Sequence, residues 1–164
     1  VGCKNLVFGC PYNRNCPEGA NTNDAISFFK EIGDYAKSKG TVIGMEANPV
    51  IYNTNYINDT VSALALIKEV DSKGFLLNLD VGTIVQNKET LSELLGHVHY
   101  INHVHISEPG LKALEKRKLH RELKQILIKE GYLGFISVEM GKTDRISVIK
   151  DTLRYIQEVF GDEL

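Results

Sequence analysis

The sequence predicts an α/β protein in which helices cover a parallel sheet, and three features of the chain support this prediction. Short, β-branched apolar runs alternate with longer helical patterns five times along the 164 residues. One run, from Phe75 to Leu79, is continuously apolar apart from Asn78, which is typical of a strand buried on both faces. The composition, with 43% hydrophobic and 24% charged residues, is that of a globular protein. We therefore expect a single domain over residues 1–164.

The expected elements follow from the spacing of the apolar residues. The strands are expected at residues 5–9, 41–47, 75–79, 100–106 and 134–138. The helices are expected at residues 23–39, 60–72 and 88–95, within 111–130, and at 145–160. Asp59 provides a cap for the second helix, and Gly40 ends the first. Five such units fit either an open doubly wound sheet or five-eighths of an eight-unit (β/α) barrel.

Charge, hydropathy and cysteine content restrict the class of function. The net charge of -2 gives little support to nucleic-acid binding. The longest apolar runs are far too short to span a membrane. The three cysteines are an odd number without a secretory signal, which indicates reduced thiols and a cytoplasmic protein. The chain begins with Val1 and enters a strand almost at once, so we expect it to be the C-terminal portion of a longer protein.

Four successive strands end in side chains that can bind a metal. Glu46 ends the second strand, Asp80 the third, His105 lies at the end of the fourth, and Glu139 ends the fifth. The carboxyl ends of parallel strands lie on the same rim, which is where ligands bind in such folds. Carboxylates this close repel one another unless a cation neutralises them. Three carboxylates and one imidazole suit Mn²⁺, Zn²⁺, Mg²⁺ or Co²⁺.

The motifs around these residues resemble those of the xylose-isomerase-like barrel superfamily. The matching segments are Met-Glu-Ala-Asn-Pro at Glu46, Leu-Asp-Val-Gly at Asp80, His-Val-His-Ile-Ser at His105, and Ser-Val-Glu-Met at Glu139. The resemblance implies a (β/α)8 TIM barrel, of which this chain covers strands four to eight while the N-terminal units are missing. The missing units, or a second copy of the chain, would then be needed to complete the barrel.

The resemblance also implies a divalent-metal-dependent sugar or sugar phosphate isomerase or epimerase. Its metal, most simply Mn²⁺, would be held by the four strand-end ligands and would act as a Lewis acid. Glu46 and Glu139 would serve as base and acid, moving a proton next to the carbonyl of a small sugar. One departure from the family pattern is Thr83, three residues after Asp80, where the family often has histidine.

Five further residues are predicted to contact the substrate. His103 shares a strand face with His105, Glu108 and His120 follow that strand, Arg14 lies in the loop after the first strand, and Thr83 follows Asp80.

Two other functions remain open. One is a zinc-dependent abasic-site endonuclease, which the negative charge and Thr83 argue against. The other is a non-catalytic sugar-binding barrel with a vestigial site.

Overall fold

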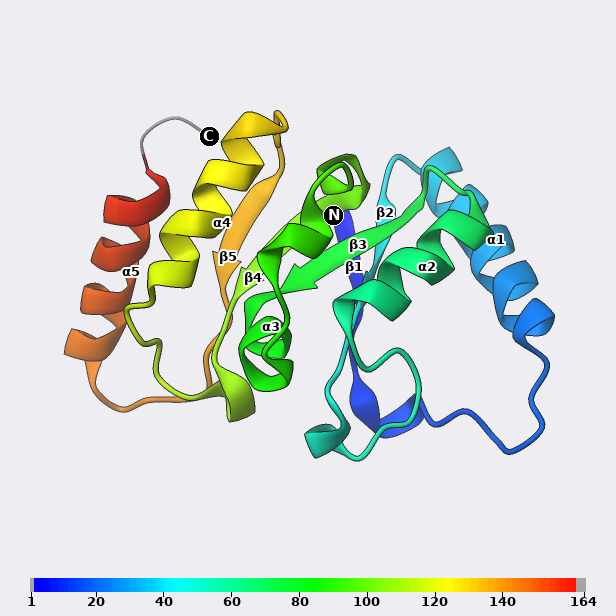
Figure 1. Cartoon of the computed structure of the whole chain (residues 1–164), viewed down its shortest axis with the longest axis horizontal. Coiled ribbons are helices and arrows are strands. Elements are labelled where there is room, and N and C mark those ends of the chain that lie inside the picture. Colours follow the sequence, from blue (N-terminus) through cyan, green and yellow to red (C-terminus); the bar gives the residue numbers. More distant parts are fainter. Residues whose placement is uncertain (1, 162–164) are drawn as a thin grey trace.

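The computed structural model describes residues 2–161 and contains one five-stranded sheet. All strand pairs are parallel, and the strand order is the chain order, β1-β2-β3-β4-β5. The strands are β1 (Asn5–Phe8), β2 (Val42–Glu46), β3 (Phe75–Asp80), β4 (Ile101–Ile106) and β5 (Phe135–Val138). The helices are α1 (Thr22–Ser38), α2 (Thr60–Val70), α3 (Val81–Asn87), α4 (Lys118–Lys129) and α5 (Ile146–Phe160). The predicted alternation of strands and helices is therefore confirmed (Figure 1).

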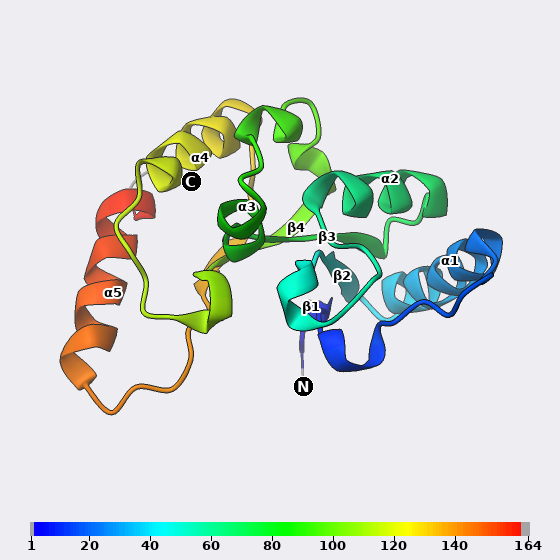
Figure 2. The same cartoon turned by 60° about the horizontal axis from the view of Figure 1, so that its bottom comes forward.

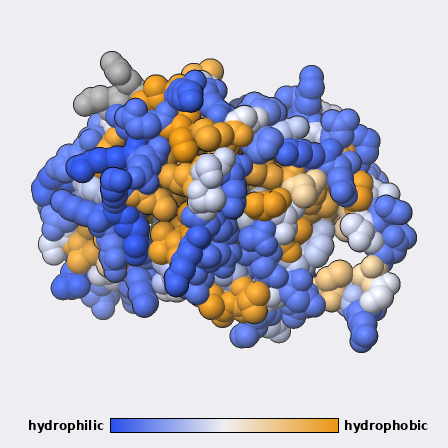
Figure 3. Space-filling model, viewed as in Figure 1, coloured by the Kyte–Doolittle hydropathy of each residue, from blue (hydrophilic) through white to orange (hydrophobic). Residues whose placement is uncertain are grey.

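The sheet is curved, and its helices lie on one side. Figure 2 shows the helices as an arc around the outside of the strands, which makes the molecule a half-barrel. The core lies between the two layers and is built from outward-facing strand residues and inward-facing helix residues. Its fully buried members include Met45, Leu77, Leu79, Val104, Ala63, Val70, Leu123 and Leu127. Figure 3 shows hydrophilic side chains over most of one face, with hydrophobic ones in the seams between the helices.

One expected helix is wrong in position. A helix was expected at residues 88–95, but α3 begins at Val81 and ends at Asn87, where Lys88 takes a left-handed conformation (φ 56°). A short 3-10 helix, Leu91–Leu94, occupies part of the expected range. The physical reason is the cap, because Asp80 accepts a hydrogen bond from the Thr83 N–H and starts the helix directly at the strand end.

The inner face of the half-barrel carries a group of polar side chains. Strand alternation directs toward this face Asn5, Glu46, Asn78, Asp80, His103, His105 and Ser137. The half-barrel therefore presents these polar side chains on a concave surface, with the strand ends forming its rim.

No helix within residues 2–161 has both the length and the apolar character needed to cross a bilayer.

Candidate metal centre

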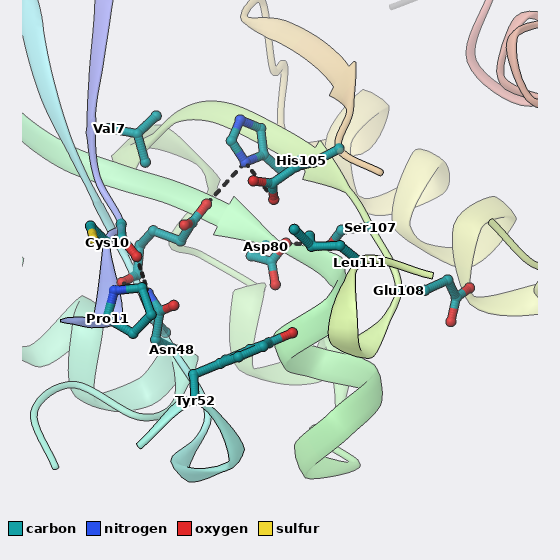
Figure 4. Close-up of a pocket in the computed structure, with 14 residues that line it drawn as sticks. Val7, Cys10, Pro11, Asn48, Tyr52, Asp80, His105, Ser107, Glu108 and Leu111 are labelled. Atoms are coloured by element: carbon teal, nitrogen blue, oxygen red, sulfur yellow. Dashed lines mark hydrogen bonds and ion pairs between the residues drawn. The ribbon is translucent and has the colours of Figure 1, made fainter. Parts of the chain in front are cut away.

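Four side chains converge at the C-terminal ends of β2 to β5. Glu46 and Asp80 are the last residues of their strands, His105 is the second-last residue of β4, and Glu139 directly follows β5. One ligand atom from each of the four lies within 4.8 Å of the others. The residues that the sequence places at successive strand ends thus meet at one point of the rim (Figure 4).

The imidazole of His105 lies between two carboxylates. Its Nδ1 atom is 2.9 Å from Glu46 Oε1 and 3.4 Å from Glu139 Oε2. Burial lowers the pKa of His105, but its hydrogen bonds with Glu139 and Glu46 outweigh that effect and raise the pKa to about 10. Without a metal, a proton on His105 therefore supplies the positive charge among the three carboxylates. This donor set fits a divalent cation, which would take the place of that proton.

Hydrogen bonds hold both oxygens of Asp80. Ser107 Oγ donates to Oδ1, while the Thr83 N–H donates to Oδ2 at 2.7 Å. Ser107 also accepts a hydrogen bond from the Gly82 N–H at 2.8 Å. Burial and the charge of Glu46 raise the pKa of Asp80 to about 6, although these hydrogen bonds act in the opposite direction. These hydrogen bonds fix the orientation of the carboxylate, as groups that hydrogen-bond a metal ligand commonly do.

A pocket of about 390 Å³ opens beside the four candidate ligands. This volume lies in the range of small-molecule sites. Its lining includes the four candidate ligands together with Val7, Gly9, Cys10, Pro11, Ala47, Asn48, Tyr52, Ser107, Glu108 and Leu111. Ser107 and Asn48 were not predicted as site residues. Ser107 was detectable in principle, because strand alternation puts it two residues beyond His105 on the same side.

Two charged residues predicted to contact substrate are already engaged by other protein groups. Arg14 is buried, and its guanidinium donates to the backbone carbonyls of Glu46 at 2.6 Å and Tyr56 at 3.3 Å. Arg14 thus holds the backbone at the end of β2 and does not line the pocket. Glu108 lines the pocket, but Arg117 Nε and Nη2 bind its carboxylate oxygens at 2.7 and 2.6 Å.

The other three predicted contacts lie outside the lining of this pocket. Thr83 Oγ1 lies 2.9 Å from both Ala47 O and Asp80 Oδ2, and so supports a candidate ligand. His103 lies on the inner face, with Nε2 2.8 Å from Ser137 Oγ. His120 is wholly buried. Its Nδ1 hydrogen-bonds the hydroxyl of Tyr155 on α5 at 2.9 Å. The expected substrate contact by His120 is therefore not supported by its position.

The comparison with known families identifies the fold. The family described as Xylose isomerase-like TIM barrel matches residues 1–159. The chain belongs to this family, and the resemblance seen in the sequence is confirmed. No curated protein matches the chain at a significant level.

Solved structures share the fold at low sequence identity. D-psicose 3-epimerase from Clostridium cellulolyticum H10, solved with D-tagatose, is 16% identical with a TM-score of 0.74, over 98% of this chain and 65% of that one. A xylose isomerase-like TIM barrel protein from Mycobacterium smegmatis, in complex with magnesium, is 21% identical with a TM-score of 0.69, over 96% and 60%. An AP endonuclease, family 2, from Brucella melitensis is 18% identical with a TM-score of 0.68, over 93% and 60%. The chain thus spans less than two thirds of each of these proteins.

Proposed function

We propose that the protein is a divalent-metal-dependent isomerase or epimerase of a small sugar. The observation that carries this proposal is the convergence of Glu46, Asp80, His105 and Glu139 beside a pocket of small-molecule size. These four residues would hold the metal, and the oxygen-rich ligand set favours Mn²⁺ among the divalent ions, with Mg²⁺, Co²⁺ and Zn²⁺ as alternatives. The five units would correspond to strands four to eight of the family barrel.

The two glutamates are suited to different parts of a proton transfer. When bound, the metal supplies Lewis-acid polarisation of a sugar carbonyl and its neighbouring hydroxyl. Glu46 comes from β2 and Glu139 follows β5, so the two carboxylates approach the centre from opposite sides of the ligand set. One glutamate removes the proton next to the carbonyl, and the other returns a proton. Return to the opposite face of the same carbon gives epimerisation, whereas return to the former carbonyl carbon, with a hydroxyl proton passing from one oxygen to the other, gives isomerisation.

The charges around the pocket favour a sugar over a nucleic acid. No lysine or arginine occurs among the described residues that line the pocket. Of the two nearby arginines, Arg14 is committed to backbone carbonyls and Arg117 to Glu108. A phosphodiester chain needs exposed cations, because phosphate contacts dominate its affinity. The sugar epimerases among the similar folds also favour a sugar substrate, although the AP endonuclease, family 2, shares the fold at a slightly lower TM-score of 0.68.

The first test is metal binding by the wild-type protein and by Glu139→Gln. We expect about one Mn²⁺ per chain in the wild type and a rise in melting temperature on binding, because binding to the folded state stabilises it. Glu139→Gln removes a charged ligand and should lose this metal. In ketose and sugar phosphate assays, its kcat should fall by about 10²- to 10⁴-fold, which is the usual contribution of a general acid or base.

The matched control is Glu158→Gln, an exposed glutamate on α5, which should retain both metal and turnover. A Glu139→Gln variant with full activity would contradict the assignment. A protein that binds metal but turns over no sugar would indicate a vestigial site. Cleavage of abasic DNA would favour the endonuclease alternative.

A further inference from the structure

We propose that Asn78 is a positioning residue of the metal site, which orients Glu46 through a relay of three side-chain amides. The inference rests on the metal site proposed above and adds a residue that does not itself bind the metal. Asn78 lies on β3, two residues before Asp80, and its side chain has no exposed surface. A fully buried amide requires hydrogen-bond partners inside the protein, and for Asn78 these partners include the candidate ligand Glu46.

The relay runs in one direction across the inner face. Asn102 Nδ2 donates to Asn5 Oδ1 at 2.7 Å, and Asn5 Nδ2 donates to Asn78 Oδ1 at 3.3 Å. Asn78 Nδ2 then donates to Glu46 Oε1 at 2.6 Å. Because an ionised carboxylate can only accept, the relay ends at Glu46. The hydrogen bond that Asn78 Oδ1 accepts from Asn5 therefore turns the Asn78 NH₂ group toward the carboxylate.

Two backbone features allow the relay to form. β1 and β3 are separated by β2, and Gly44 of β2 has no side chain to stand between Asn5 and Asn78. A Cβ at Gly44 would lie 2.9 Å from Asn5 Oδ1 and 3.0 Å from Asn78 Cβ, which is closer than ordinary contact. On β4, the pairing with β3 skips Asn102, so this residue is free of the regular register. The backbone thus brings together amides from strands that are not neighbours.

The relay acts on the part of Glu46 that faces His105. Glu46 Oε1 accepts from Asn78 and lies 2.9 Å from His105 Nδ1, while Asn78 Nδ2 lies 3.2 Å from the same ring atom. The other carboxylate oxygen, Oε2, lies against Gly9, which lines the pocket. Since the orientation of Glu46 is set before a metal arrives, less side-chain entropy is lost on binding. Removing the amide should therefore weaken metal binding without removing a ligand.

The test measures Mn²⁺ affinity by titration calorimetry and the visible absorption of bound Co²⁺, in the intact natural protein. Asn78→Leu keeps the approximate side-chain size but removes the amide. We expect about tenfold to a hundredfold weaker Mn²⁺ binding, the usual effect of losing a hydrogen-bond partner of a metal ligand, with a changed Co²⁺ spectrum. Asn5→Ala cuts the relay one step earlier and should have a smaller effect of the same sign.

The control is Leu127→Ala, which opens a cavity in the core beneath α4, away from the strand-end rim. It should lower the melting temperature while leaving Mn²⁺ affinity and the Co²⁺ spectrum unchanged. If Asn78→Leu does not fold, Asn5→Ala carries the test alone. The inference is overturned if the folded relay variants bind Mn²⁺ within about twofold of wild type, or if Leu127→Ala loses as much affinity. A wild-type protein that binds no metal overturns the proposed function itself.

Discussion

His120 illustrates how burial decides the role of a titratable residue. Its imidazole has no exposed surface, and its Nδ1 is hydrogen-bonded to the Tyr155 hydroxyl. Burial lowers the pKa of His120 to about 4; the charge of Glu108 opposes this shift, and that of Arg117 adds to it. The ring is therefore neutral in the folded protein at physiological pH. It supports the packing of α4 on α5 and is not available to a substrate.

This shift predicts a loss of stability in acid. Below pH 6.5, the unfolded chain takes up a proton at His120 that the folded protein takes up only near pH 4, so acid favours unfolding. Between pH 7 and 4.5, the wild type should lose on the order of 2–3 kcal/mol more than His120→Gln, which does not titrate. Urea unfolding at both pH values measures the difference.

The control for this prediction is His99→Gln, at an exposed histidine. It should follow the wild type over the same pH range. Equal acid sensitivity of wild type and His120→Gln would show that His120 takes up its proton equally well in both states.

At the scale of elements, the crossing of α1 over the start of β3 depends on glycine. A Cβ at Gly74 would overlap the carbonyl oxygen of Gly33 and lie 2.9 Å from the Lys37 nitrogen, both of which belong to the backbone of α1. Beside this crossing, the rings of Phe29 and Phe75 are stacked with their centroids 4.7 Å apart. The helix and the strand are therefore packed too closely to admit even a methyl group.

Gly74→Ala should consequently destabilise the protein by about 1–3 kcal/mol, the usual cost of overpacking. Gly33→Ala is the matched comparison, because its Cβ would meet the side chains of Ser72 and Phe75 rather than backbone, and alanine favours the helix by about 1 kcal/mol. Its cost should be the smaller of the two. Urea unfolding measures both variants, and a Gly74→Ala protein as stable as wild type would contradict the close crossing.

At the scale of the whole molecule, the half-barrel has two open sheet edges, at β1 and β5. Apolar side chains are exposed beside the second edge, with Phe135 75%, Leu133 92% and Leu153 57% accessible. An open strand edge with exposed apolar residues pairs readily with another chain. The polypeptide of residues 1–164, prepared alone, should therefore associate as its concentration rises.

Sedimentation velocity over a range of concentrations tests this expectation. Phe135→Lys places a charge on the edge strand and should reduce the association. Tyr35→Lys, at an exposed position on α1, should leave it unchanged. A polypeptide that stays monomeric at every concentration, or equal effects of the two variants, would show that the β5 edge does not drive association.

The sequence by itself determined the order of elements and the four candidate ligands. Period-two alternation and the apolar runs locate strands, and a polar residue at the end of a parallel strand must lie on the common rim. Both are local properties, so Glu46, Asp80, His105 and Glu139 could be named before their distances were known. The start of α3 at Val81 was missed, because the valine and glycine there do not favour a helix until Asp80 caps it.

Only the tertiary structure decided which polar residues remain free to meet a ligand. Arg14 Nη1 donates to a carbonyl 32 residues away, and His120 Nδ1 is hydrogen-bonded to a hydroxyl 35 residues away. Asn78 donates to Glu46, 32 residues away, and accepts a hydrogen bond from Asn5, 73 residues away. Each outcome depends on contacts between segments that are remote in sequence, and a buried polar group takes whichever partner the packing brings to it. The local sequence pattern therefore specifies the strand position and face of a side chain, whereas the tertiary packing of the half-barrel specifies which groups that side chain contacts.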